Sequence, residues 1–427
     1  MTAVSHPTQL LKQRRFAPLF WTQFFNAFND NFLKNALIIL VEYRSAPVWG
    51  LPPAEIVALA GGIFILPFFL FSALAGQIAD KYEKAHVIRW IKRIEIAIMC
   101  LATTGFLFHQ PGFLLFVLFA MGLHSTFFGP IKYSILPQHL SSEELVAGNA
   151  MVEAGTFVSI LLGTIAGGVI FPLPHGRWMV SIGLMLIAVI GYVVCLWIPN
   201  ARAVEPNLKI NFEPIGPSIQ IFRFTKKPAS VFWSIVAISW FWFVGAIMLS
   251  IFPPLCKEVL HGPEWLVTTY LALFSIGIAT GSLLTARLSR GILNLSFVSA
   301  GFVGITIFAA ILWFLSSHDP NTVLIGLNLF LFSIFGGFFI VPLYTLMQER
   351  SEQENRSRVI AANNILNAFF MVIASLALLA LLHFHFSIAE VMLFVSITNL
   401  LMLFYMCWKM PELRLATQRL FGLRLRA

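Results

Sequence analysis

Residues 16–42 read FAPLFWTQFFNAFNDNFLKNALIILVE, which is long enough to cross a membrane as one helix, since about 20 residues suffice. The centre of this segment, FFNAFNDNFLKN at residues 24–35, nevertheless holds four asparagines and a lysine around Asp30. Ionisable groups at the centre of a membrane helix cost roughly 2.5 to 3.5 kcal/mol each, so they usually face a polar cavity or one another. The segment therefore predicts a membrane helix with a polar face.

The helical period collects these polar groups into one stripe. Asn26, Asp30 and Lys34 recur at intervals of four residues, and Asn31 and Asn35 lie in the adjoining column. We interpret the stripe as the lining of a transport path. The alternative is an ion pair between Asp30 and Lys34 that only packs this helix into a bundle.

The composition is that of a polytopic membrane protein. The chain is 58% hydrophobic and 11% charged, whereas soluble proteins average about 45 to 50% apolar and about 25% charged residues. Hydropathy predicts twelve spans. These are residues 16–42, 54–78, 88–108, 112–137, 144–171, 178–198, 229–253, 265–288, 294–316, 321–348, 359–383 and 387–408. We expect an all-α membrane protein with twelve transmembrane helices.

The basic residues indicate the topology. They gather before the first span, after every second span and in the tail: Lys12, Arg14, Arg15, Lys81, Lys84, Arg89, Lys92, Arg93, Arg202, Lys209, Arg223, Lys226, Lys227, Arg287, Arg290, Arg350, Arg356, Arg358, Lys409, Arg414, Arg419, Arg424 and Arg426. The other loops offer Arg44, Arg177 and Lys257. The positive-inside rule then places both termini and the central loop in the cytoplasm. The net charge of +9 therefore sets topology and contacts anionic membrane lipid, and we expect no nucleic-acid partner.

Patterns typical of catalysis are missing from the sequence. We find no phosphate-binding loop, no catalytic constellation and no metal-ligand cluster, and the four cysteines have no paired spacing. We therefore expect neither an enzyme nor a protein with a cofactor, metal or disulfide. No cleavable signal peptide is visible, so the first helix is expected to direct membrane insertion.

An internal repeat divides the chain. Residues 128–154, FGPIKYSILPQHLSSEELVAGNAMVEA, recur as residues 340–368, IVPLYTLMQERSEQENRSRVIAANNILNA. Pro130 then aligns with Pro342, Asn149 with Asn363, and Glu153 with Asn367. We expect two pseudo-symmetric six-helix bundles at 1–198 and 229–427, joined by a cytoplasmic linker at 199–228, with a substrate site between them. The C-terminal bundle carries the basic cytoplasmic tail.

This arrangement resembles the major facilitator superfamily, and a local motif agrees with it. Residues 76–89, GQIADKYEKAHVIR, resemble the superfamily signature between the second and third spans. Gly76 permits close helix contact, Asp80 accepts hydrogen bonds from a neighbouring helix N-terminus, and Arg89 ends the basic part of the motif. We expect these residues to control gating. A solvated charge cluster is the alternative.

Charged residues inside the spans concentrate in the N-terminal half. Lys132 and Glu153 lie roughly 8 and 14 Å from the cytoplasmic ends of consecutive helices, so they are close enough to pair. Either a structural ion pair or a substrate role fits this spacing. His124 is expected to be a hydrogen-bonded packing residue.

The C-terminal half offers neutral residues in the corresponding spans. The seventh span has Trp233, Trp240, Phe241, Trp242 and Phe243, and later spans add Asn328, Asn363, Asn364 and Asn367. One wall of acids and bases opposite an aromatic wall suits an amphiphile with a charged head and a hydrocarbon tail.

Three segments carry a closer resemblance. RRFAPLFWTQFFNAFNDNFLKNALIIL, GPIKYSILPQHL and NAMVEAGTFVSILLGTIAGG resemble lysophospholipid transporters of the LplT type, and look closer still to the transporter domain fused to acyltransferase and acyl-carrier-protein synthetase domains. The resemblance is strong over residues 14–170 and weaker but colinear afterwards. It implies inward flipping of lysophospholipids across the bacterial inner membrane, so that a separate cytoplasmic acyltransferase rebuilds the diacyl lipid.

The resemblance also implies functional residues. The family's motif residues fall on Asp30 and Asn31, on Lys132 and Tyr133, and on Asn149 and Glu153. Two departures concern the headgroup: Asn29 replaces the glycine of free-standing members, and the basic residue expected in the seventh span is absent.

The two lines of reasoning combine into one hypothesis. Lys132 and Lys34 bind the lipid phosphate, while Asp30 and Glu153 attract an ethanolamine ammonium or help gating. Asn26, Asn31, Asn149, Asn363 and Asn367 complete the expected substrate-binding set. The alternatives are a proton-coupled exporter of drugs or small amphiphiles, with Asp30 or Glu153 as its proton site, and a membrane scaffold for lipid enzymes.

Overall fold

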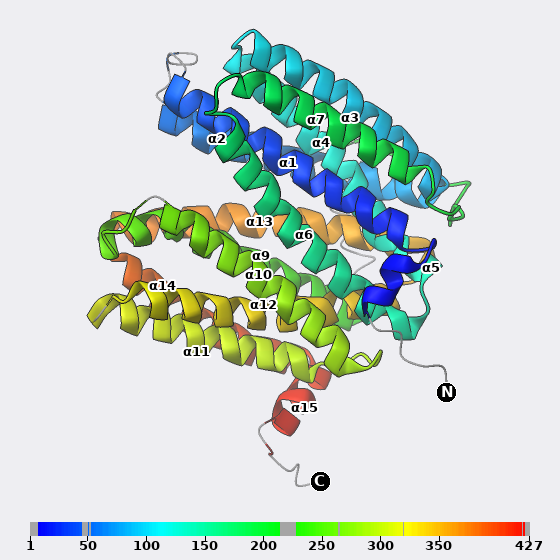
Figure 1. Ribbon diagram of the computed structural model, residues 1–427. Helices are drawn as coiled ribbons and strands as arrows, with labels where there is room; N and C mark the ends of the chain where they lie inside the picture. Colours follow the sequence, from blue (N-terminus) through cyan, green and yellow to red (C-terminus); the bar gives the residue numbers. More distant parts are fainter. Residues whose placement is uncertain are drawn as a thin grey trace.

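Nearly all of the chain that is described forms helices (Figure 1). The computed structural model describes residues 7–44, 50, 53–213, 228–263, 265–318, 320–420 and 422. The first half contains η1 (Pro7–Lys12), α1 (Ala17–Arg44), α2 (Pro53–Lys81), α3 (Lys84–Leu107), α4 (Pro111–Ser134), α5 (Leu136–His139), α6 (Ser142–Ile170) and α7 (Gly176–Cys195). The second half contains α9 (Ala229–Pro254), the π-helical η2 (Leu255–Val259), α10 (Trp265–Ser289), α11 (Ser296–His318), α12 (Thr322–Arg350), η3 (Gln353–Asn355), α13 (Arg356–His383), α14 (Ile388–Lys409) and α15 (Pro411–Leu420).

Twelve of the described helices have 20 or more residues, and they coincide with the twelve expected spans. Ten described helices are long and apolar enough to cross a membrane. The other two are α1 and α3, which carry the charged residues discussed below. The expected all-α membrane fold is therefore confirmed, and the largest shift of a helix start is at α3, which begins at Lys84 instead of residue 88.

Local side-chain contacts explain several helix starts. The Glu83 carboxylate accepts the backbone N–H groups of Ala85 and His86 at 2.9 and 2.7 Å, which begins α3 four residues early. Ser141 and Glu144 form a capping box at the start of α6. These caps satisfy backbone donors that the first turn leaves without partners.

The twelve long helices pack as two bundles (Figure 1). The first six pack mainly against one another, as in the pairs α1 with α6, α2 with α4 and α3 with α7. The last six do the same, as in α10 with α12, α11 with α14 and α9 with α13. Contacts between the bundles join α6 to α10 and α12, and join α2 and α4 to α13. Duplicated halves of this kind are the arrangement that the internal repeat predicts.

One side of the molecule holds the segment between the bundles. Residues 199–213 lie against the end of α2 and the start of α3, so we call this the linker side. The backbone N–H groups of Val204 and Glu205 both donate to the carbonyl oxygen of Asp80 at 3.0 Å, and Gln77 exchanges two hydrogen bonds with the backbone of Asn211. Of the expected linker at 199–228, residues 214–227 lie outside the described residues, as do the basic residues expected within them; the exact bundle limits stay a prediction.

Candidate functional site

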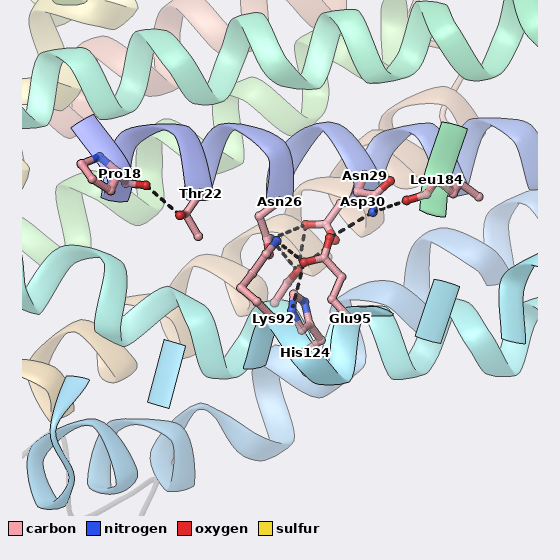
Figure 2. A network of polar contacts seen from close by, with 10 residues as sticks. Pro18, Thr22, Asn26, Asn29, Asp30, Lys92, Glu95, His124 and Leu184 are labelled. Atoms are coloured by element: carbon pink, nitrogen blue, oxygen red, sulfur yellow. Dashed lines mark hydrogen bonds and ion pairs between the residues drawn. The ribbon is translucent and has the colours of Figure 1, made fainter. Parts of the chain in front are cut away.

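Asp30, in the polar stripe of α1, points toward α4. The hydroxyl oxygen of Ser125 lies 2.9 and 2.8 Å from the two carboxylate oxygens of Asp30, and the amide of Asn26 donates to the same carboxylate at 3.3 Å. Asp30 is 8% exposed and Asn26 is 5% exposed. The carboxyl is thus held by neutral donors, which fix its orientation without an ion pair (Figure 2).

Beneath Asp30 lies a second polar group, which the sequence did not reveal as a unit (Figure 2). Glu95 of α3 forms an ion pair with Lys92, accepts a hydrogen bond from Asn29 at 3.0 Å and lies 3.6 Å from His124. Lys92 and Glu95 are fully buried. We counted Lys92 among the cytoplasmic basic residues at the start of the third span, whereas the structure buries it two turns into α3, where it pairs with Glu95. His124 is a buried packing residue beside Glu95, as expected, but no hydrogen bond to its ring is present among the described residues.

Lys34 does not pair with Asp30. In the described part of the chain no carboxylate lies within 4.0 Å of its ammonium, and the side chain is partly exposed. Asn31 and Asn35 instead donate to α1 carbonyl oxygens one turn earlier, at 2.8 and 2.9 Å, and Asn35 also reaches Thr164 of α6 at 3.2 Å. The ion-pair alternative for this stripe is therefore not what the structure shows.

Lys132 likewise has no acidic partner within 4.0 Å among the described residues. Its ammonium lies 4.5 Å from the ring centre of Tyr133, whereas Glu153 accepts a hydrogen bond from the Tyr133 hydroxyl at 2.5 Å. The ion pair between Lys132 and Glu153, one of the two interpretations of this spacing, is thus not formed; a tyrosine–carboxylate contact takes its place, with Lys132 over the aromatic face. Glu153 is 1% exposed.

The neighbours of Lys132 on α4 show which part of the molecule its face of the helix contacts. Ser125, Gly129 and Lys132 are spaced four and three residues apart, so they share one face of α4. A Cβ on Gly129 would lie 2.8 Å from the Asn364 side chain of α13. One turn further, the Tyr133 and Tyr344 rings stack at 4.5 Å between the bundles. Lys132 therefore lies on the face of α4 that meets the C-terminal bundle, and Asp30 contacts the same face through Ser125.

Of the three remaining expected asparagines, Asn149 and Asn367 make hydrogen bonds to other helices. Asn149 exchanges hydrogen bonds of 2.7 and 3.0 Å with Gln348 and donates to Thr345 at 3.2 Å, so it joins α6 to α12 across the bundles. Asn367 accepts from Ser239 at 2.8 Å. Asn363 is fully buried, and in the described part of the chain neither of its amide atoms has a hydrogen-bond partner of regular geometry.

Gly76 and Asp80 contact α13 on the linker side. A Cβ on Gly76 would lie 2.8 Å from the Ala361 Cβ, which shows how closely α2 and α13 cross. Asp80 accepts the backbone N–H of Ser357 at 3.3 Å and the Arg358 guanidinium at 3.1 Å. The negative charge therefore lies at the start of α13, where a helix favours it.

Arg358 extends this contact to the linker, while Arg89 lies elsewhere. The Arg358 guanidinium also donates to Glu205 at 2.5 Å. Arg89 donates to the carbonyl oxygen of Ile198, beyond the end of α7, at 3.3 Å. Of the three residues expected to control gating, the structure thus brings Gly76 and Asp80 to the bundle interface and leaves Arg89 within the N-terminal bundle.

The aromatic wall is smaller than the sequence suggested. Phe157 of α6 packs against Phe241 and Trp242 of α9, with ring centres 6.3 Å apart in both pairs. Trp240 donates to Asn399 of α14 at 2.9 Å, and Trp233 packs against another α14 residue. The aromatic residues surround α9, so only part of the set meets the other bundle.

The sequence identifies the family. Residues 19–375 match the sequence model of the Major Facilitator Superfamily. The chain belongs to the major facilitator superfamily. In this superfamily member the two bundles are the expected duplicated halves, and the site described above lies on the N-terminal one.

Curated relatives confirm the narrower resemblance. The transporter is 29% identical to the lysophospholipid transporter LplT of Klebsiella pneumoniae over 378 residues, which is 86% of this chain and 88% of the relative. It is 28% identical over 384 residues to the protein of the same name in Escherichia fergusonii, with the same coverage.

Solved structures share the fold. The human organic anion transporter MFSD10 superimposes with a TM-score of 0.74 at 15% identity, covering 91% of this chain and 97% of that one. The transporter FucP in its outward conformation gives a TM-score of 0.71 at 12% identity, covering 93% and 100%. At these identities the similarity concerns the fold alone.

Proposed function

We propose that this transporter moves lysophospholipids such as lysophosphatidylethanolamine from the outer to the inner leaflet of the bacterial inner membrane. The curated relatives named as lysophospholipid transporters span 86% of the chain and support this substrate class. The ionisable side chains of the first bundle and the aromatic side chains of the second support an amphiphilic substrate.

The observation that carries the proposal is the Lys132 ammonium. Among the described residues no carboxylate lies within 4.0 Å of this partly exposed group, although it lies in the last turn of α4 on the face that meets the other bundle. A cation held in an apolar protein without a counter-ion is costly, and an anionic substrate group removes that cost. We assign Lys132, assisted by Lys34, to the lipid phosphate.

The other headgroup contacts follow from the same geometry. Asp30 is held by Ser125 and Asn26 without a cation within 4.0 Å in the described part of the chain, so it suits an ethanolamine ammonium. Glu153 binds Tyr133 at the stacked Tyr133–Tyr344 pair, which suits a part in gating. The acyl chain would lie against Phe241 and Trp242.

Alternating access supplies the mechanism. The described contacts between the bundles gather on the linker side and extend inward as far as Phe157, about halfway along α6. This conformation is therefore closed on the linker side, and its opening requires the Asp80 and Asn149 contacts to break. We assign the linker side to the cytoplasm from the positive-inside rule, and we propose that a separate acyltransferase there consumes the substrate.

A vesicle assay tests the residue assignment. Protein reconstituted into liposomes with labelled lysophosphatidylethanolamine in one leaflet should flip it, and Lys132→Ala and Asp30→Ala should each lose most of the rate. Lys209→Ala is the matched control, because Lys209 lies in the exposed part of the linker, away from both bundles' interior. Equal rates for Lys132→Ala, Asp30→Ala and the parent would refute the assignment. A flux of another amphiphile that collapses with the pH gradient, without lysolipid transport, would favour the proton-coupled exporter.

A further inference from the structure

A polar cavity of about 770 Å³ lies on the linker side, apart from the site described above. Three parts of the chain line it: Pro137 and Gln138 of α5, residues 200–204 of the linker, and residues 353 and 354 of η3 with Arg356 at the start of α13. The cavity therefore exists only where the N-terminal bundle, the linker and the C-terminal bundle meet. Its size is within the roughly 300 to 1,000 Å³ of small-molecule sites.

Two arginines, Arg202 and Arg356, line this cavity. Arg202 is exposed, and among the described residues its guanidinium makes no ion pair or hydrogen bond. Arg356 donates one hydrogen bond to the carbonyl oxygen of Ser351 at 3.3 Å, but its Nε is buried and has no partner within the described residues. Glu354 contributes a carboxylate to the lining. A guanidinium with a free donor is suited to the oxygen atoms of a phosphate.

Apart from Glu354 in the lining, the carboxylates of Glu83, Asp80 and Glu205 near the cavity already have partners. Glu83 accepts three backbone N–H groups, from Ala85, His86 and Ala201. Asp80 and Glu205 both pair with Arg358. Lys84, whose backbone N–H donates to the carbonyl oxygen of the lining residue Ala201, is 1% exposed, and its ammonium has no hydrogen-bond partner among the residues that the structure describes. Unsatisfied buried cations beside a polar cavity favour an anionic ligand.

We propose that this cavity binds a phosphate group between Arg202 and Arg356, and that the bound phosphate holds the linker side closed. A ligand that contacts both bundles binds only the conformation in which they meet, so it shifts the population toward that conformation. The phosphate comes either from a soluble phosphate compound or from the headgroup of an anionic phospholipid. The inference rests on the cavity alone and does not depend on lysophospholipid as the transported substrate.

Thiol labelling measures this effect. Thr345 is fully buried where α12 meets α6, so in Thr345→Cys, made in a chain whose four native cysteines are replaced by alanine, a maleimide reacts only when the bundles separate on the linker side. Inorganic phosphate at constant ionic strength should slow labelling in detergent. Nanodiscs with phosphatidylglycerol, compared with phosphatidylcholine, test the lipid source. Slowing in either arm supports the proposal and identifies the source.

Arg202→Gln tests the site itself. Because the variant loses one charge-assisted contact, the amount of phosphate or phosphatidylglycerol that half-maximally slows labelling should rise by about tenfold or more. Arg287→Gln is the matched control, because Arg287 is an exposed arginine of α10 that does not line the cavity. The proposal is overturned if neither phosphate source slows labelling of the parent, or if Arg202→Gln responds as the parent does. Lysolipid flipping, measured separately, keeps this result distinct from the proposed function.

Discussion

At the scale of single residues, the charges in the N-terminal bundle fall into two classes. Lys92 and Glu95 neutralise each other in a fully buried pair, whereas Lys34 and Lys132 have no carboxylate within 4.0 Å among the described residues. A satisfied pair stabilises a conformation, while an unsatisfied cation favours binding of an anion. We therefore assign structure to the first class and substrate to the second.

The buried pair makes a stability prediction. Lys92→Met leaves Glu95 buried without its cation, so we expect a loss of about 3 to 5 kcal/mol, seen as a large fall in the thermal unfolding temperature in detergent. The double variant Lys92→Met with Glu95→Leu should recover much of that loss, because no uncompensated charge remains. Glu412→Gln, which breaks the exposed pair with Arg350, is the control and should cost about 1 kcal/mol or less. A double variant as unstable as Lys92→Met would contradict this account.

Some of the residue contacts could be predicted from the sequence and others could not. The polar stripe, the position of Asp30 in it and the Asp80 contact at a helix start were predictable, because they depend on helical period and on helix-end electrostatics. The pairing of Glu153 with Tyr133 instead of Lys132 was not predictable. The depth of a residue along its helix does not determine which side chain of the neighbouring helix contacts it. The bundle contact of Asn149 depends on how α6 meets α12, which no local pattern encodes.

At the scale of helices, apolar length predicted nearly every boundary. The largest error was at α3, where the Glu83 cap starts the helix within a basic segment that hydropathy assigns to a loop. The structure places Lys92 two turns along α3, where it is fully buried. The amphipathic α15 was also missed, because its ten residues are too short and polar to register as a span.

The crossing of α2 and α13 makes a prediction at this scale. Any Cβ at Gly76 would meet the Ala361 Cβ at 2.8 Å and the Arg358 Cα at 3.1 Å, so Gly76→Val must push the helices apart. We expect faster maleimide labelling of Thr345→Cys and slower lysolipid flipping. Gly168→Val is the matched control, since a Cβ at Gly168 meets nothing within 4 Å. Unchanged labelling in Gly76→Val would show that this crossing does not hold the linker side closed.

At the scale of the whole molecule, the two halves share a fold but differ in charge at equivalent places. Asp80, in the last turn of α2, binds Arg358 of the other bundle, while Thr285, near the end of α10, donates within its own helix to the carbonyl oxygen of Gly281 at 2.9 Å. The ionic contact between the bundles at these two helix ends is one-sided, so its removal should release the linker side.

Asp80→Ala therefore tests how the molecule closes. It removes charge-assisted hydrogen bonds to the start of α13, and a loss of one or two kcal/mol from the closed form should raise the labelling rate of Thr345→Cys about 5- to 30-fold. Arg89→Gln should leave the rate unchanged, because Arg89 contacts Ile198 within its own half. If Arg89→Gln opened the linker side as much as Asp80→Ala, closure would depend on the shape of the N-terminal bundle and not on the Asp80–Arg358 contact.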